Sequence, residues 1–249
     1  MAEPLAIRTD VRGFQALIGA GEIRAGDAVL YCYGRQNPLS WAIRRVQVRA
    51  LRDLLRQPQS PEEIAARAAQ GEEGDRTDRS DRTDLLVGTG ACWTHAGMVV
   101  DAGISAEMTS PRARLITWEK RLQVGDRLLV VRPQSASEKQ MQFATENMEK
   151  LVDHRTRYPW RELLTYWFST LPAAIAAPHF AEHFLDHRRD VCSGAIWKAW
   201  WDEGAVEADG GDSMPESWYP GRMAIDTKYL HRVAEVTIVE DGKGDADED

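Results

Sequence analysis

Three side chains in this chain are of the types that cooperate in acyl-transfer chemistry: Cys192, His95 and Glu107. A cysteine hydrolase needs a thiolate that attacks a carbonyl carbon, a histidine that moves the proton, and a polar group that orients the histidine. The histidine and the glutamate are close in sequence, whereas the cysteine lies far downstream. The three residue types together predict cleavage or transfer of an acyl group through a covalent thioester.

The segment around Cys192 has the pattern of a helix start. Asp190 is a candidate N-cap, and apolar residues follow the cysteine at helical spacing, at Ala195, Ile196, Ala199 and Trp200. The free N–H groups and the positive dipole end of a first helical turn favour thiolate over thiol. The alternative is a buried structural cysteine, because free cysteine is among the most buried residue types. The histidine and glutamate upstream shift the balance towards a nucleophile.

His95 lies in a predicted strand, and the short loop 101–103 joins that strand to the one bearing Glu107. With Gly103 in the left-handed conformation, such a loop pairs Glu107 with Gly97 and makes Glu107 a diagonal neighbour of His95 on one sheet face. A loop one residue shorter or longer would put Glu107 on the opposite face. A neighbouring carboxylate would favour imidazolium and fix the tautomer. The alternatives are a core histidine and a solvent-facing glutamate.

Other histidines and cysteines give weaker signals for a metal. His179, His183 and His187 share one face of a predicted helix, and two such residues can bind Zn²⁺. The segment is not the HExxH arrangement of zinc peptidases, however, and no further ligands are evident. Cys92 and His95 have opposite strand parity, so both cannot point at one ion in a regular strand. The sequence therefore predicts no metal site.

The elements that must position these residues are helices interleaved with antiparallel strands. Alternation and turn signals indicate strands over 28–33, 92–101, 104–109, 127–132 and 229–239. Helical periodicity indicates helices over 11–19, 41–55, 137–152 and 162–187, besides the one that begins at Cys192. The sequence has no βαβ repeat and no glycine-rich phosphate loop. The expected fold class is α+β, with a small antiparallel sheet packed against the helix that carries the cysteine.

Composition predicts one domain over residues 1–239. Residues 56–84 include a low-complexity run of alternating charge, which we interpret as a mobile insertion. The acidic segment 240–249 is predicted to be a disordered tail. A formal net charge of −8 argues against a nucleic-acid backbone as the main partner.

The three cysteines do not make a disulfide framework. The first residues lack the pattern of a signal peptide, and no segment is long and apolar enough to span a bilayer. We therefore expect residence in the cytoplasm and no stable membrane insertion, with export by a specialised secretion system left open. No cofactor is expected.

Several motifs together resemble a known family. THAGMVVD, ISAEMTS, LLVVRP, RYPW and DVCSGAIWKAW, in this order, resemble the circularly permuted branch of the NlpC-like, papain-fold cysteine hydrolases. In that branch the histidine strand precedes the cysteine helix, as it does in this chain. The resemblance covers residues 23–238, apart from the 56–84 insertion.

The resemblance implies a permuted papain-like fold in which Cys192 is the nucleophile, His95 the base and Glu107 the third polar residue. It also places the hydroxyl of Tyr158 near the oxyanion, beside the backbone N–H of Cys192, although a packing tyrosine is the alternative. The chain departs from the pattern at Val191, where many members have an aspartate directly before the cysteine.

The leading substrate class, by resemblance, is an amide bond in a peptidoglycan stem peptide, cleaved by an amidase or endopeptidase. Lipid acyl esters or thioesters come second, because the apolar stretch 163–184 could meet an acyl chain. The alternatives for this stretch are burial in the core and a lid over the cleft. An isopeptide outside peptidoglycan comes third. The alternative from another class is a catalytically silent binding or effector module of the same fold.

Overall fold

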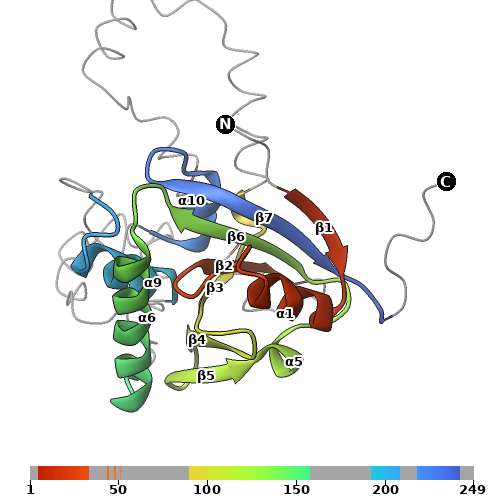
Figure 1. Ribbon diagram of the computed structural model, residues 1–249, viewed down its shortest axis with the longest axis horizontal. Helices are drawn as coiled ribbons and strands as arrows, with labels where there is room; N and C mark the ends of the chain where they lie inside the picture. Colours follow the sequence, from red (N-terminus) through yellow and green to blue (C-terminus); the bar gives the residue numbers. More distant parts are fainter. Residues whose placement is uncertain are drawn as a thin grey trace, which may run out of the picture.

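The computed structural model describes residues 5–33, 44, 48, 51, 90–157, 192–207 and 218–241. Seven strands in these residues form one sheet with the spatial order β1-β7-β6-β2-β3-β4-β5 (Figure 1). Their bounds are β1 Leu5–Thr9, β2 Ala28–Cys32, β3 His95–Val99, β4 Ile104–Met108, β5 Ala113–Thr117, β6 Arg127–Pro133 and β7 Leu230–Ile238. Neighbouring strands are antiparallel except β1 and β7, which are parallel.

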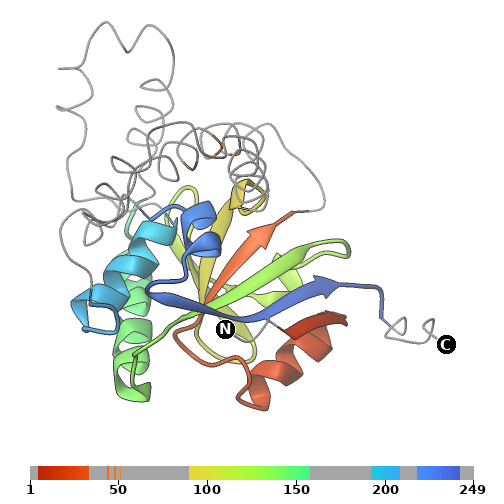
Figure 2. The same cartoon turned by 90° about the horizontal axis from the view of Figure 1, so that it is seen from above.

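Helices cover both faces of this sheet, as the two views in Figures 1 and 2 show. Their bounds are α1 Val11–Gly19, α5 Trp118–Arg121, α6 Glu138–Asp153, α9 Cys192–Asp202 and α10 Pro220–Ile225. The helices α6, α9 and α10 share one apolar cluster with one sheet face, and α1 and α5 share a second cluster with the other face. The fold is therefore α+β, as the sequence predicts.

Alternation along β2 shows how one strand serves two cores. Leu30 belongs to the cluster under α6 and α9, whereas Val29 and Tyr31 belong to the cluster under α1 and α5. Successive side chains of a strand point to opposite faces, so a strand buried on both sides is apolar throughout. All five residues of β2 are buried accordingly.

The helix α9 begins at Cys192, where the sequence predicts a helix start. Its predicted apolar stripe is buried, at Ala195, Ile196, Ala199 and Trp200. The indole of Trp200 also donates a hydrogen bond to the carbonyl of Gly26, at 2.9 Å. This bond holds α9 against the turn before β2 and so helps to position Cys192 relative to the sheet.

The helix α6 confirms the helix predicted over 137–152 and packs against α9. Ser137 is its N-cap and accepts a hydrogen bond from the backbone N–H of Gln140, at 3.3 Å. The side chain of Gln140 accepts one from the backbone N–H of Ser137 at 2.9 Å. This reciprocal arrangement is a capping box, which satisfies two N–H groups that a helix start leaves free.

The structure differs from the sequence-based expectation in several elements. The strand expected over 92–101 begins only at His95, because residues 90–91 form a helical turn. The strands β1 and β5 and the helices α5 and α10 were not predicted, and the sheet has seven strands and a parallel pair. The two helices have four and six residues, too few for a helical period to stand out. The two strands lie at the edges of the sheet and bury few side chains, so their sequences lack a strong apolar alternation.

Three further predictions lie outside the described residues: the 56–84 insertion, the helix over 162–187, and all but residues 240–241 of the acidic tail. Of the helix predicted over 41–55, only residues 44, 48 and 51 are described, and they are helical. Among the helices that are described, none is both long enough and apolar enough to cross a membrane.

Candidate functional site

The hairpin of β3 and β4 has the predicted register. Met98 pairs with Ala106 and Val99 with Ser105, so Gly97 stands opposite Glu107. The loop 101–103 does not have the expected conformation, because Gly103 is not left-handed and has no positive φ. The carboxylate of Asp101 closes the loop instead, accepting hydrogen bonds from the backbone N–H groups of residues 103 and 104 at 2.6 and 3.0 Å.

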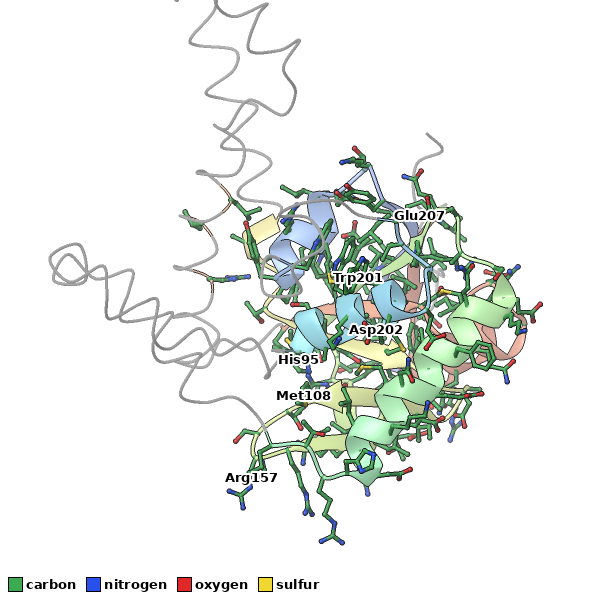
Figure 3. The ribbon with its side chains drawn as sticks, turned by 90° about the vertical axis from the view of Figure 1, so that its left-hand side faces the viewer. His95, Met108, Arg157, Trp201, Asp202 and Glu207 are labelled. Carbon is green, nitrogen blue, oxygen red and sulfur yellow. The ribbon has the colours of Figure 1, made fainter. Side chains whose placement is uncertain are left out.

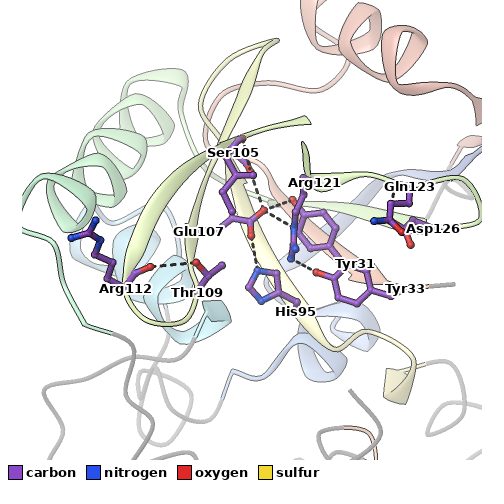
Figure 4. A network of polar contacts seen from close by, with 11 residues as sticks. Tyr31, Tyr33, His95, Ser105, Glu107, Thr109, Arg112, Arg121, Gln123 and Asp126 are labelled. Atoms are coloured by element: carbon purple, nitrogen blue, oxygen red, sulfur yellow. Dashed lines mark hydrogen bonds and ion pairs between the residues drawn. The ribbon is translucent and has the colours of Figure 1, made fainter. Parts of the chain in front are cut away.

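This register brings His95 and Glu107 into direct contact, as Figure 4 shows. Nε2 of His95 lies 2.8 Å from Oε2 of Glu107. The glutamate is fully buried, contrary to the alternative of a solvent-facing residue. Its second oxygen, Oε1, accepts hydrogen bonds from the hydroxyl groups of Tyr31 and Ser105, each at 3.0 Å.

A fourth group on this carboxylate is Arg121, at the end of α5. Its Nε lies 3.0 Å from Oε1 of Glu107, but the N–H is not aimed at a hydrogen-bond acceptor, so the contact is an ion pair. The guanidinium also lies 4.6 Å above the ring of Tyr31 and donates a hydrogen bond to the hydroxyl of Tyr33. Burial opposes the charge of Glu107, but His95, Arg121 and Ser105 outweigh it and lower the pKa of the carboxyl.

Gly97 is what allows this packing. A Cβ at this position would lie 2.8 Å from Cγ of Glu107 and 3.0 Å from the hydroxyl of Tyr31. Side-chain carbons do not approach this closely, so any larger residue would push the carboxylate or the phenol away. The space beside this glycine is therefore filled by the polar network that supports His95.

Cys192 and Glu107 contact His95 from opposite faces of the sheet. Cys192 belongs to the buried cluster under α9, which includes Ala96, whereas Glu107 points to the other face. His95 is the first residue of β3 and bonds with both. Because Nε2 faces the glutamate, Nδ1 is the ring nitrogen left for the thiol.

The electrostatics of this pair favour a thiolate facing an imidazolium. Burial opposes ionisation of Cys192, but the charge and hydrogen bond of His95, together with the backbone N–H groups of Ala96 and Ser193, lower the pKa of the thiol. Burial also opposes the charge of His95, and Arg121 adds repulsion, but Cys192 and Glu107 raise the pKa of the imidazole overall. Both shifts favour the thiolate form of Cys192, which is the nucleophilic form of a cysteine.

Other residues named from the sequence are not part of the described site. Tyr158, Asp190 and Val191 lie outside the described residues, as do the three histidines at 179, 183 and 187. Within the described part of the chain, no group of three potential ligands could hold a metal ion. The sequence reasoning missed Tyr31, Ser105 and Arg121. Only Ser105 carried a signal, since it shares strand parity with Glu107.

The arrangement provides a buried thiol at a helix start, an imidazole within hydrogen-bond reach of it, and a buried carboxylate that orients the imidazole. Comparison of the chain with protein-family models, with curated proteins and with solved structures gives no significant match. The chemistry of the site is therefore inferred from its residues and their geometry.

Proposed function

We propose that this protein is a cysteine hydrolase of the permuted papain-like class, with Cys192 as nucleophile, His95 as base and Glu107 as the group that orients it. The observation that carries the proposal is the contact series from Cys192 to His95, whose Nε2 lies 2.8 Å from the buried Glu107. A packing cysteine needs neither an imidazole partner nor a buried carboxylate behind that partner.

In this mechanism the Cys192 thiolate attacks the carbonyl carbon of an amide. The backbone N–H of Cys192 at the start of α9 is suited to bind the developing oxyanion. The imidazolium of His95 gives its Nδ1 proton to the leaving amine, and a thioester remains. His95 then accepts a proton from water, which attacks the thioester and releases Cys192. Throughout this cycle Glu107 holds the ring orientation and keeps a proton on Nε2.

The substrate we propose is an amide in a peptidoglycan stem peptide, a class taken from the resemblance. One feature supports a substrate with carboxylates: Arg112 and Arg157 pair as backbone neighbours in an antiparallel bridge, and both side chains are exposed. Directly opposite residues point to the same side, and like charges there are unfavourable without an anion between them. Figure 3 shows Arg157 on the same side of the molecule as His95, beyond Met108.

The test is to incubate the purified protein with muropeptides and, separately, with short-chain and long-chain acyl esters. We expect stem-peptide fragments to be released by the wild type and not by Cys192→Ala or His95→Ala. Asp202→Asn, an exposed carboxylate at the far end of α9 that pairs with Lys198, is the matched control and should keep full activity.

Three results would change the proposal. Cleavage of acyl esters with intact muropeptides would replace the amide by a lipid substrate and keep the nucleophile. Full activity of His95→Ala would contradict the proposed mechanism. No activity on either panel would contradict both substrate classes and favour an isopeptide substrate or a binding module.

A further inference from the structure

The other two cysteines of the chain form a second thiol site. Cys32 ends β2, and Cys92 lies in the turn just before β3. The backbone N–H of Thr94 donates a hydrogen bond to the carbonyl of Tyr31, at 3.0 Å, which holds this turn against the end of β2. The thiol of Cys92 is hydrogen-bonded to the sulfur of Cys32, and the two sulfurs are not joined by a disulfide in the structure.

Two guanidinium groups lie beside this pair. Nη2 of Arg44 is 3.6 Å from Sγ of Cys32. Arg127 is the ladder partner of Cys32 in β6, and its guanidinium lies 5.8 Å above the ring of Trp93. The charge of Arg127 is shared with Glu235 of β7, with which it forms an ion pair. Cations beside a thiol favour its thiolate form.

These contacts shift the pKa values of the two thiols in opposite directions. The hydrogen bond from Cys92, together with Arg44 and Arg127, outweighs burial and lowers the pKa of Cys32 to about 6. The same hydrogen bond, burial and the negative charge of Cys32 raise the pKa of Cys92 well above its usual range. At neutral pH the pair is thus one thiolate and one thiol in contact, which is the arrangement of a peroxide-sensitive cysteine beside a resolving cysteine.

We propose that Cys32 and Cys92 form a reversible oxidation site, at which a hydroperoxide converts the two thiols into an intramolecular disulfide. The Cys32 thiolate attacks the peroxide, an S–O bond forms as the O–O bond breaks, and the leaving oxygen takes a proton from solvent. The sulfur of Cys92 then attacks the sulfenic acid of Cys32, the S–S bond forms, and water leaves with the Cys92 proton. Exchange with a small-molecule thiol restores both cysteines.

The site is separate from Cys192 and does not depend on the proposed hydrolase function. Cys32 is only 8% exposed, whereas Cys92 is partly exposed, so a small peroxide is better suited to reach the thiolate than a bulky reagent. The disulfide would join the end of β2 to the chain that leads into β3, without breaking a strand pair.

The test uses the full chain with Cys192→Ser, which removes the third thiol. The protein is treated with equimolar hydrogen peroxide at pH 7, free thiols are blocked with iodoacetamide, and unreduced peptides are mapped by mass spectrometry. We expect a Cys32–Cys92 linked peptide that reduction by dithiothreitol abolishes. In the additional variant Cys92→Ser, dimedone should trap a sulfenic acid at Cys32, which keeps the test decisive if the disulfide is strained.

The pH dependence gives a second readout. Oxidation should change less than twofold in rate between pH 7 and 8, whereas an ordinary thiol, with a pKa of about 8.5, would speed up about eightfold. Arg44→Gln should slow oxidation severalfold at pH 6. The proposal is overturned if both cysteines stay fully alkylated after peroxide, if only intermolecular disulfides form, or if dimedone labels Cys92 in Cys32→Ser as fast as it labels Cys32 in Cys92→Ser.

Discussion

Replacing Glu107 by glutamine separates the charge of this residue from its shape. Oε1 of the carboxylate faces the guanidinium of Arg121, which has no acceptor atoms. The amide oxygen of a glutamine must therefore take the position of Oε1, and its NH₂ group must face Nε2 of His95. That nitrogen can then only accept a hydrogen bond, so the ring becomes neutral and its proton moves to Nδ1, the nitrogen left for Cys192.

The expected cost follows from this change of tautomer. A histidine protonated on the side of the nucleophile cannot take its proton, and the corresponding Asp→Asn exchange in serine-protease triads costs about 10⁴ in kcat. Without an imidazolium, burial of Cys192 is no longer outweighed, and its pKa returns to the ordinary value or above. A thiol of pKa about 8.5 is only ~3% ionised at pH 7. We therefore expect Cys192 in Glu107→Gln to react with iodoacetamide at least about tenfold more slowly at pH 7.

The assay follows alkylation of each cysteine by peptide mass spectrometry from pH 5 to 9, which needs no substrate. In the wild type the rate at Cys192 should stay high on the acid side, because His95 lowers the pKa of the thiol. In Glu107→Gln the fall in the alkylation rate of Cys192 on the acid side should occur at higher pH than in the wild type. The control Asp202→Asn should have the wild-type profile. An unchanged Cys192 profile in Glu107→Gln, with the protein folded by circular dichroism, would refute the tautomer argument.

Two more substitutions test the same network. Gly97→Ala places a Cβ 2.8 Å from Cγ of Glu107. We expect the unfolding free energy to fall by about 1–3 kcal/mol and Cys192 to be alkylated more slowly. Gly19→Ala, where a Cβ meets nothing within 4 Å, is the control and should change neither quantity. Arg121→Gln leaves the carboxylate of Glu107 buried without the guanidinium, and we expect the unfolding free energy to fall by about 3–5 kcal/mol. The same exchange at the exposed Arg127 should lower it by less than about 1 kcal/mol. Both values can be measured by urea denaturation.

The sequence predicts the central hairpin because two constraints act within a few residues. The side chains of a strand alternate, and loop length sets which residues oppose each other. The placement of Glu107 behind His95 follows from these constraints even though the loop closes through Asp101 rather than through a left-handed Gly103. The start of α9 is predictable for a similar reason, since its apolar stripe repeats at helical spacing from Cys192 onward.

The remaining contacts of the site depend on long-range packing and were not predictable. Tyr31 lies 76 residues before Glu107, and its hydroxyl becomes a donor only because β2 pairs with β3. Arg121 belongs to the short helix α5, whose four residues carry no periodic signal. The parallel strand β1 pairs with the last strand of the chain, a contact that no local pattern specifies. Periodicity and loop length specify local geometry, whereas Tyr31 and Arg121 reach Glu107 only because the whole sheet has formed.

The site also shows how four ionisable groups, two buried and two largely buried, can lie together. With Cys192 as thiolate and His95 as imidazolium, Cys192 and Glu107 carry two negative charges and His95 and Arg121 two positive charges, each on a different element. Desolvation opposes every one of these charges, and it is overcome only because each negative group has a positive partner. Arg121 neutralises the carboxylate that orients His95 and so limits how far Glu107 can raise the pKa of the imidazole. In the mechanism that we propose, the imidazole must be cationic beside the thiolate and must also give up its proton, and opposing effects of Glu107 and Arg121 on its pKa suit both steps.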